Sequence, residues 1–359
     1  MTDQSAGLRE LAPVSPDYRI DWAAVEGSLL RSLIGRMKRT QQDALWHGEG
    51  NVWNHVRLVC ESLVSMEDYR AMDRRMQEMM FLSALLHDIG KIPTTQVKDG
   101  RIRTPRHGEV GSRMARAFLW QQCGLFGTRE KMLLRETICR MIRYHMAPPH
   151  MLYGDTYRVR VPRIAAEGEL VPDFTLRRLA MLSEADNRGR ICADLDEQLA
   201  MIERSAAFAR EWGCYDGPAR FADAHTERMF FAGADVQPQK ALSDETWGEV
   251  ILLCGLSERA RERWIAENRG ELPVISLEEG QSASECAKAH LAARRCFIWN
   301  APNLTAAERA ALAEQFERAG AGVSMIYAED AERDGAVPAP EQLAVPERHE
   351  ARRVEWLCI

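Results

Sequence analysis

Leu86-His87-Asp88-Ile89-Gly90-Lys91 closes an apolar segment that begins at Phe81. The stretch places an imidazole directly beside a carboxylate at the polar end of that segment. Burying a charged group is costly unless the group is paired or bound to a metal ion. The stretch therefore predicts a cation site at the point where a buried helix ends.

Further donors of the same kinds occur on both sides of this stretch, each in an apolar surrounding or at an expected helix end: His55, His107, His145 and Asp186. Imidazole nitrogens and carboxylate oxygens are ligands of divalent ions, and the set is large enough for one or two of them. Helical bundles commonly build such sites from side chains on several facing helices. The pattern predicts a metal centre inside a helical domain.

The composition narrows the class of protein. The chain has 359 residues, of which 46% are apolar, and a net charge of −6, so it can form two domains and lacks a global basic field. Its nine cysteines include no CxxC pair, which favours reduced thiols over a disulfide framework. Residues 1–16 contain no apolar signal segment, and no apolar run is long enough to cross a bilayer. We therefore expect a cytoplasmic protein.

The first two-thirds of the chain predict helices, because apolar residues recur at helical spacing over residues 22–37, 52–66, 70–87, 108–122, 129–145, 174–187 and 194–212. The segment Tyr157–Val161 is the candidate for a short strand. After residue 248, apolar strands alternate with helical segments, which is typical of a parallel sheet. We predict an extension (1–20), an all-α domain (21–233), a linker (234–247) and a small α/β domain (248–359).

Residues 21–232 resemble the HD phosphohydrolase superfamily, which is named for its His-Asp pair. His55, His87, Asp88 and Asp186 match the four defining ligand positions of its pattern. His107 and His145 match the two extra histidines of binuclear members, and Lys91 matches the lysine of the HDxGK form. The resemblance implies a divalent cofactor, one or two ions, with manganese, magnesium, nickel, cobalt and iron left open.

The resemblance implies that such a centre hydrolyses phosphate esters. A divalent ion lowers the pKa of bound water and polarises a phosphoryl oxygen. Asp88 could be shared by two ions, and Lys91 could bind a phosphate oxygen, the alternative for Lys91 being a surface salt bridge. Arg103, Arg106 and Arg190 are candidate phosphate contacts because guanidinium groups fit phosphate, the alternative being ordinary solvated surface.

The second domain carries a degenerate phosphate loop. A loop of the form GxxxxGK[ST] uses its lysine for phosphate and its hydroxyl for magnesium. Here Gly255 is retained, but Arg261 replaces the lysine and Glu262 replaces the hydroxyl residue. An ordinary ATP site is therefore not expected.

Residues 249–329 nevertheless resemble the polynucleotide kinase branch of P-loop proteins in four segments, Leu252–Leu256, Trp264–Asn268, Leu272–Leu277 and Trp299–Thr305. The two domains in this order resemble bacterial HD-polynucleotide kinase proteins. In those proteins a phosphatase acting on 2′,3′-phosphate RNA ends is fused to a 5′-hydroxyl kinase. Glu278-Glu279 stands where the kinase pattern has an aspartate pair, and Arg333 is a candidate lid arginine. The alternative is a degenerate scaffold that packs on, or feeds, the phosphatase.

We therefore expect an α+β protein of two domains that acts as a metal-dependent phosphatase or phosphodiesterase on RNA ends, without kinase activity. Two alternatives stay open. The first is an HD enzyme that hydrolyses free nucleotides or cyclic dinucleotides. The second is a non-catalytic protein that binds RNA ends and uses its metal site structurally. Metal-dependent phosphate release from a panel of RNA ends and nucleotides separates the three.

Overall fold

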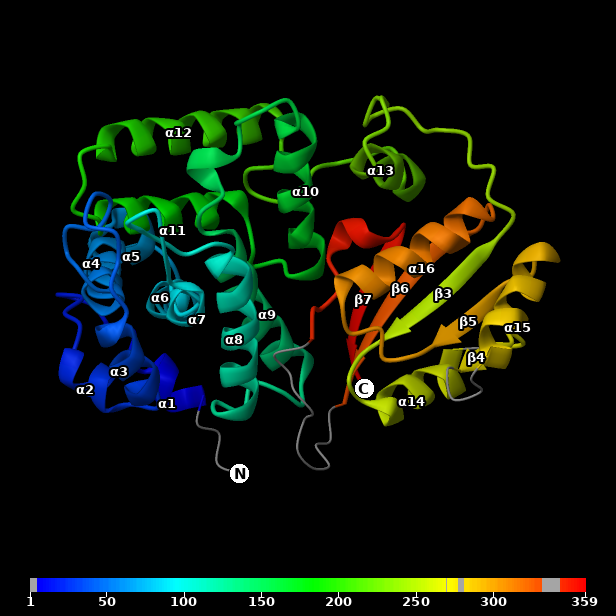
Figure 1. The fold of residues 1–359 in the computed structure, drawn as a ribbon, viewed down its shortest axis with the longest axis horizontal. Helices are drawn as coiled ribbons and strands as arrows, with labels where there is room; N and C mark the ends of the chain where they lie inside the picture. The colour runs from blue at the N-terminus through cyan, green and yellow to red at the C-terminus, as the bar shows by residue number, and fades with distance from the viewer. Residues whose placement is uncertain (1–4, 269, 277–280, 331–342) are drawn as a thin grey trace. The chain divides into compact units, whose positions relative to one another are not determined.

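The computed structural model describes residues 5–268, 270–276, 281–330 and 343–359. The chain forms two compact units, one of residues 1–125 with 133–218 and the other of residues 126–132 with 219–359 (Figure 1). Residues 219–233 thus cluster with the second unit, whereas the predicted boundaries assign them to the helical domain, and those boundaries stay a prediction. Glu278-Glu279 and Arg333 lie outside the described residues.

The first unit is built mainly from helices. They are α1 (Ser5–Arg9), α2 (Trp22–Gly27), α3 (Arg31–Arg39), α4 (Val52–Ser65), α5 (Glu67–Arg70), α6 (Arg74–Leu86), α7 (Lys91–Thr94), α8 (His107–Gln121), α9 (Arg129–Tyr144, entering from the second unit), η1 (Pro148–His150), α10 (Tyr157–Leu170), α11 (Leu176–Arg188) and α12 (Leu195–Glu211). Helices α4, α6 and α11 pack on one another, and α12 packs on α11. Within the described residues, no helix combines the length and apolar character of a membrane span.

Helix α6 is the central helix of this unit. It begins at Arg74 because the Asp73 side chain accepts a hydrogen bond from the backbone N–H of Met76 at 2.9 Å. Every residue from Met76 to Leu86 is buried, so the helix is enclosed on all sides. His87 and Asp88 follow directly and are buried as well, which places both side chains in the interior.

Two details of the predicted all-α domain are wrong. Strands β1 (Gln96–Lys98) and β2 (Arg101–Arg103) form an antiparallel hairpin. Its turn is Asp99-Gly100, and both residues have positive φ (54° and 73°), as a two-residue hairpin turn requires. The candidate strand Tyr157–Val161 is instead the start of α10. Its buried residues Val161, Ile164, Ala165 and Gly168 recur at helical spacing, so the short alternation before them was misleading.

The second unit contains the predicted parallel sheet, which the structure confirms. After α13 (Ala224–Phe231), the order of elements is β3 (Glu249–Cys254), α14 (Glu258–Asn268), β4 (Val274–Ser276), α15 (Gln281–Ala292), β5 (Phe297–Asn300), α16 (Ala306–Arg318), β6 (Gly322–Glu329), η4 (Arg348–Glu350) and β7 (Arg353–Cys358). All five strands are parallel, in the order β4-β5-β3-β6-β7 (Figure 1).

Helices cover both faces of this sheet. Leu253, Ile298 and Ile326 form one face and pack against Trp264 of α14. Phe297 lies on the opposite face, where its ring packs edge-on against that of Phe316 of α16, with the ring centroids 5.6 Å apart. The chain therefore leaves β3 toward one face and leaves β5 toward the other. In open α/β sheets, ligands bind beyond the carboxyl ends of two neighbouring strands related in this way.

Candidate metal centre

The structure brings six predicted residues together in the core of the first unit. They come from distant parts of the chain: His55 from α4, His87 and Asp88 after α6, His107 from the start of α8, His145 after α9 and Asp186 from α11. All are buried except His107, which is partly exposed. Three groups of these side chains could each hold an ion: His55 with His87 and Asp88, His87 with His145 and Asp186, and Asp88 with His107 and His145.

Asp88 lies between two pairs of histidines. Its Oδ2 is 3.5 Å from Nε2 of His55 and 3.3 Å from Nε2 of His87. Its Oδ1 is 3.4 Å from Nε2 of His107 and 3.8 Å from Nε2 of His145. Asp186 completes the first side, because its Oδ1 is 2.9 Å from Nε2 of His55. One carboxylate thus faces a nitrogen pair with each of its oxygens.

Local hydrogen bonds fix the orientation of three rings. Nδ1 of His87 donates to the Ala84 carbonyl at 2.7 Å, and Nδ1 of His145 donates to the Ile142 carbonyl at 2.7 Å. Nδ1 of His107 lies 2.9 Å from the Thr104 carbonyl. A ring that donates from Nδ1 keeps the lone pair of Nε2 for a ligand. The three lone pairs therefore point into the centre.

The donor set fits divalent ions. Neither oxygen of Asp88 accepts a hydrogen bond of good geometry within the described part of the chain. Nε2 of His107 and Nε2 of His145 are 3.2 Å apart, and Nε2 of His55 and Nε2 of His87 are 3.3 Å apart. Burial lowers the pKa of His145 to about 3, so this ring is neutral. Close nitrogen pairs around one buried carboxylate are the arrangement a cation relieves.

A close backbone contact brings His107 to this centre. Gly90 follows the His-Asp pair, and a Cβ at that position would lie 2.0 Å from the carbonyl oxygen of His107 and 2.6 Å from the backbone nitrogen of Gly111. Any side chain would push α8 away. Gly90 is therefore required for His107 to reach Asp88.

Lys91 is buried and not at the surface. Its Nζ is 2.7 Å from Oδ2 of Asp88 and donates to Oε1 of Gln42 at 2.7 Å. Nε2 of His47 lies 3.5 Å from the same ammonium group. The salt bridge considered for Lys91 is therefore buried and not at the surface, and the charge of Lys91 faces the histidine cluster.

The predicted arginines differ in their surroundings. Arg103 and Arg106 are exposed, the first 4.0 Å from Asp99 and the second 2.6 Å from Glu109. Arg190 is half-buried, and one of its terminal nitrogens donates to Asn187, one residue after Asp186. Only Arg190 is therefore held beside a residue of the cluster by a contact that the structure describes.

Three neighbours of the cluster were not predicted from the sequence. Gln42 and His47 contact Lys91, and Glu49 lies 3.0 Å from Nδ1 of His55. His47 is hydrogen-bonded rather than solvent-facing, because its Nδ1 is 2.7 Å from Glu49. Only the tertiary contacts of His47 and Glu49 identify them.

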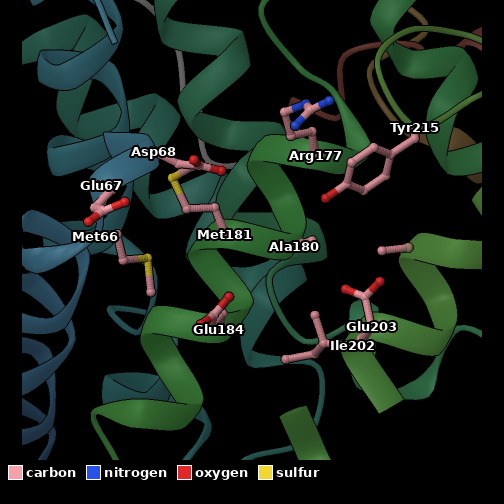
Figure 2. Close-up of a pocket in the computed structure, with 11 residues that line it drawn as sticks. Met66, Glu67, Asp68, Arg177, Ala180, Met181, Glu184, Ile202, Glu203 and Tyr215 are labelled. Atoms are coloured by element: carbon pink, nitrogen blue, oxygen red, sulfur yellow. The ribbon is translucent and has the colours of Figure 1, made fainter. Parts of the chain in front are cut away.

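A separate pocket of about 300 Å³ lies between α5, α11 and α12 (Figure 2). None of the six clustered residues lines it. Its walls carry the four carboxylates of Glu67, Asp68, Glu184 and Glu203 and a single guanidinium, that of Arg177, which is itself paired with Asp216. Like charges repel, so this pocket disfavours a phosphate, and the histidine cluster is the better candidate for phosphate chemistry.

In the second unit, Gly255 and Arg261 meet at the carboxyl ends of β3 and β5. Gly255 has φ 136°, and a Cβ there would lie 2.3 Å from the Ala328 carbonyl oxygen. The buried Arg261 donates to the Gly255 carbonyl at 2.6 Å and to Oδ1 of Asn300 at 3.0 Å. Glu262 is exposed. A protein cation therefore lies where phosphate-binding loops hold a ligand.

A protein-family model matches a large part of the first unit. Residues 52–197 match the family model of the HD domain. All six clustered residues fall inside this range, as does Lys91, whereas Gln42, His47 and Glu49 precede it. HD domains are generally those of metal-dependent hydrolases that act on phosphate esters. No curated protein matches the chain.

Proposed function

We propose that this protein is a metal-dependent phosphohydrolase whose centre is formed by the six clustered residues. The observation that carries the proposal is the position of Asp88, each of whose oxygens faces a pair of histidine nitrogens. His55, His87, Asp186 and Oδ2 of Asp88 would hold one ion. His107, His145 and Oδ1 of Asp88 would hold a second. Bound divalent ions activate water and polarise phosphoryl oxygens.

The other charged groups bind and orient the substrate in this proposal. Lys91 supplies a fixed positive charge beside Asp88, where a phosphate oxygen would approach. Arg190 supplies a guanidinium whose Nε has no hydrogen-bond partner among the described residues. A guanidinium with a free donor suits a phosphate oxygen.

As substrate we propose RNA that ends in a 2′- or 3′-phosphate. The support is the basic hairpin with Arg101, Arg103 and Arg106 directly before His107, together with a parallel α/β unit in the same chain. One observation favours the alternative of a small nucleotide substrate. Arg101 is bound by Asp43 at 2.7 Å and Arg106 by Glu109, so part of the hairpin charge is already neutralised.

The salt dependence of hydrolysis tests this choice. We expect kcat/KM for a short 3′-phosphate RNA to exceed that for free nucleotides, and to fall more steeply with salt. In a plot of log affinity against log salt concentration, each phosphate contact on a single strand makes the slope more negative by about 0.7. The measurement is kcat/KM for both substrates at two salt concentrations.

A double substitution of the exposed Arg103 and Arg106 by glutamine provides the variant, and Arg204→Gln on α12 is the matched control. The variant should flatten the salt slope for RNA, and the control should leave it unchanged. Nucleotides that are better substrates at both salt concentrations would show that the RNA-end proposal is wrong and would favour the nucleotide alternative.

For the second unit we propose a degenerate kinase-like module that does not transfer phosphate. The support is that Arg261 is bound by protein acceptors and that Glu262 offers no hydroxyl for magnesium. Without the phosphate-binding lysine, the charge of a transferring phosphoryl group is not stabilised.

We expect no transfer of labelled phosphate from ATP to a 5′-hydroxyl RNA above the background of an Arg261→Ala variant. The missing lysine and the acidic residue at the magnesium position both act against transfer. Thin-layer or gel separation of the labelled products measures the result. Transfer by the wild type above that background would contradict the proposal.

A further inference from the structure

Glu49 lies in a closed loop that precedes the part of the chain matched by the HD model. The bridge between Gln41 and Asn51 closes the base of this loop, and the backbone N–H of Gln42 donates to the Gly50 carbonyl at 2.9 Å. The Glu49 side chain is only 2% exposed. A buried carboxylate needs donors around it, and the donors identify what it holds in place.

One oxygen of Glu49 faces two histidines. Oε1 is 3.0 Å from Nδ1 of His55 and 2.7 Å from Nδ1 of His47. The other rings of the cluster donate from Nδ1 to backbone carbonyls three residues earlier in the chain. His55 is the exception, because the group that faces its Nδ1 at ion-pair distance is a carboxylate. A carboxylate acceptor fixes the tautomer and makes the other ring nitrogen a stronger ligand.

The second oxygen of Glu49 ties the loop to the segment that follows α11. Oε2 accepts a hydrogen bond from the backbone N–H of Ile191 at 3.0 Å. The backbone N–H of Gly48 donates to the Ile191 carbonyl at 3.0 Å. Asp186 and Arg190 lie just before Ile191. The two hydrogen bonds to Ile191 therefore hold the segment of Asp186 against the loop that also faces His55.

The third contact runs through His47. Its Nε2 lies 3.5 Å from Nζ of Lys91, and Lys91 is 2.7 Å from Asp88. Glu49 thus faces His55 directly and is linked to Asp88 through His47 and Lys91. His47, Glu49 and His55 could themselves form a small ion site. The two Nδ1 atoms already lie at hydrogen-bond distance from the same Oε1, so this group needs no ion.

We propose that Glu49 is a positioning residue of the metal centre, which orients His55 for its ion and holds the segment of Asp186 and Arg190 against it. This inference rests on the proposed function, because it requires that the cluster binds a divalent ion. It adds a residue outside the family match to the machinery of the site.

The test is the affinity of the full-length protein for Mn²⁺, measured by calorimetric titration without substrate. Glu49→Gln keeps the volume of the side chain but replaces one oxygen by an amide nitrogen and removes the charge. We expect the variant to remain folded and to bind Mn²⁺ about 10–100-fold more weakly, which is the usual cost of losing such an orienting partner. A shift of the His55 Nδ1 resonance in ¹⁵N NMR spectra should accompany the loss.

Glu78→Gln is the matched control. Glu78 is a buried carboxylate of the same unit, bound by Arg9 at 2.6 Å and Arg74 at 2.9 Å, and it does not contact the cluster. The control should lose stability and keep the Mn²⁺ affinity.

The outcomes distinguish this inference from the proposed function. Wild-type affinity in Glu49→Gln overturns the positioning role and leaves the proposed function intact. A wild-type protein that binds no Mn²⁺ overturns the proposed function and this inference with it. If Glu49→Gln does not fold, Glu49→Asp decides by the same comparison, because its shorter side chain cannot reach both His55 and Ile191 from the same backbone.

Discussion

Asp88→Asn is expected to abolish metal-dependent phosphate release while the helical content stays largely intact. Asp88 is the carboxylate that faces both pairs of histidine nitrogens, so its replacement removes one negatively charged ligand from each proposed ion site. Loss of an outer partner alone costs about 10–100-fold in affinity or activity. We therefore expect the loss in kcat to exceed about 100-fold. Phosphate release, metal content and circular dichroism measure the three quantities.

Single histidine variants give the contrast to Asp88→Asn. His107→Ala and His145→Ala each remove a ligand from one side of Asp88, and should reduce the number of bound ions from two to one. Asp173→Asn is the control, because Asp173 is a partly exposed carboxylate that pairs with Arg75 at 2.6 Å. Retained turnover and metal content in Asp88→Asn would refute this site. Full stoichiometry in both histidine variants would refute a binuclear centre.

Glu136→Gln is expected to destabilise the first unit strongly. Glu136 is fully buried, with Arg116 at 2.7 Å and Arg135 at 2.8 Å, and both arginines are buried too. Breaking a buried ion pair by removing one partner costs about 3–5 kcal/mol, because a charge is left without compensation. Urea unfolding measures the loss. Glu203→Gln at the surface pair with Arg210 is the control and should cost no more than about 1 kcal/mol.

The same substitution has a pH signature. Burial raises the pKa of Glu136, but the charges of Arg116 and Arg135 outweigh it and lower the pKa from the ordinary 4.5 to about 2. A carboxyl with a lowered pKa stabilises the folded state above its ordinary pKa, and this stabilisation is lost as the pH falls toward the folded value. The stability difference between wild type and variant should therefore shrink between pH 4.5 and 2. A difference independent of pH would contradict this account.

Much of the fold is readable from local patterns. The helical spacing around His55, His87 and Asp186 predicts α4, α6 and α11, because each helix buries a broad apolar face. The alternation after residue 248 predicts the parallel sheet. The hairpin of β1 and β2 was missed although Asp99-Gly100 is a strong turn signal, because its strands are short and exposed. The strand β7 was missed too, since it lies far from the preceding β6 in the sequence.

Some residues of the candidate site could be predicted from the sequence, and others could be found only in the structure. Histidines and aspartates at helix ends are visible in the sequence because polar side chains there interrupt apolar segments. Glu49 and His47 are not, because their roles come from contacts with Ile191, 142 residues away, and with Lys91, 44 residues away. Such contacts depend on loop closure and packing, which no local pattern encodes. The exposure of Arg103 and Arg106 likewise follows from how the hairpin folds.

The group that faces Nδ1 of each histidine ring lies either in the preceding helix or in a separate loop. This difference determines whether an insertion or deletion in the chain would disturb the orientation of that ring. His87 and His145 donate to carbonyls of the helices that they follow, so each ring and its acceptor shift together as one body. His55 depends on a residue six positions earlier, in a separate loop. An insertion or deletion in residues 43–50 would change the reach of that loop and disconnect His55, whereas a length change before α6 leaves His87 oriented. Among related proteins with the same centre, we therefore expect the length of this loop to stay constant.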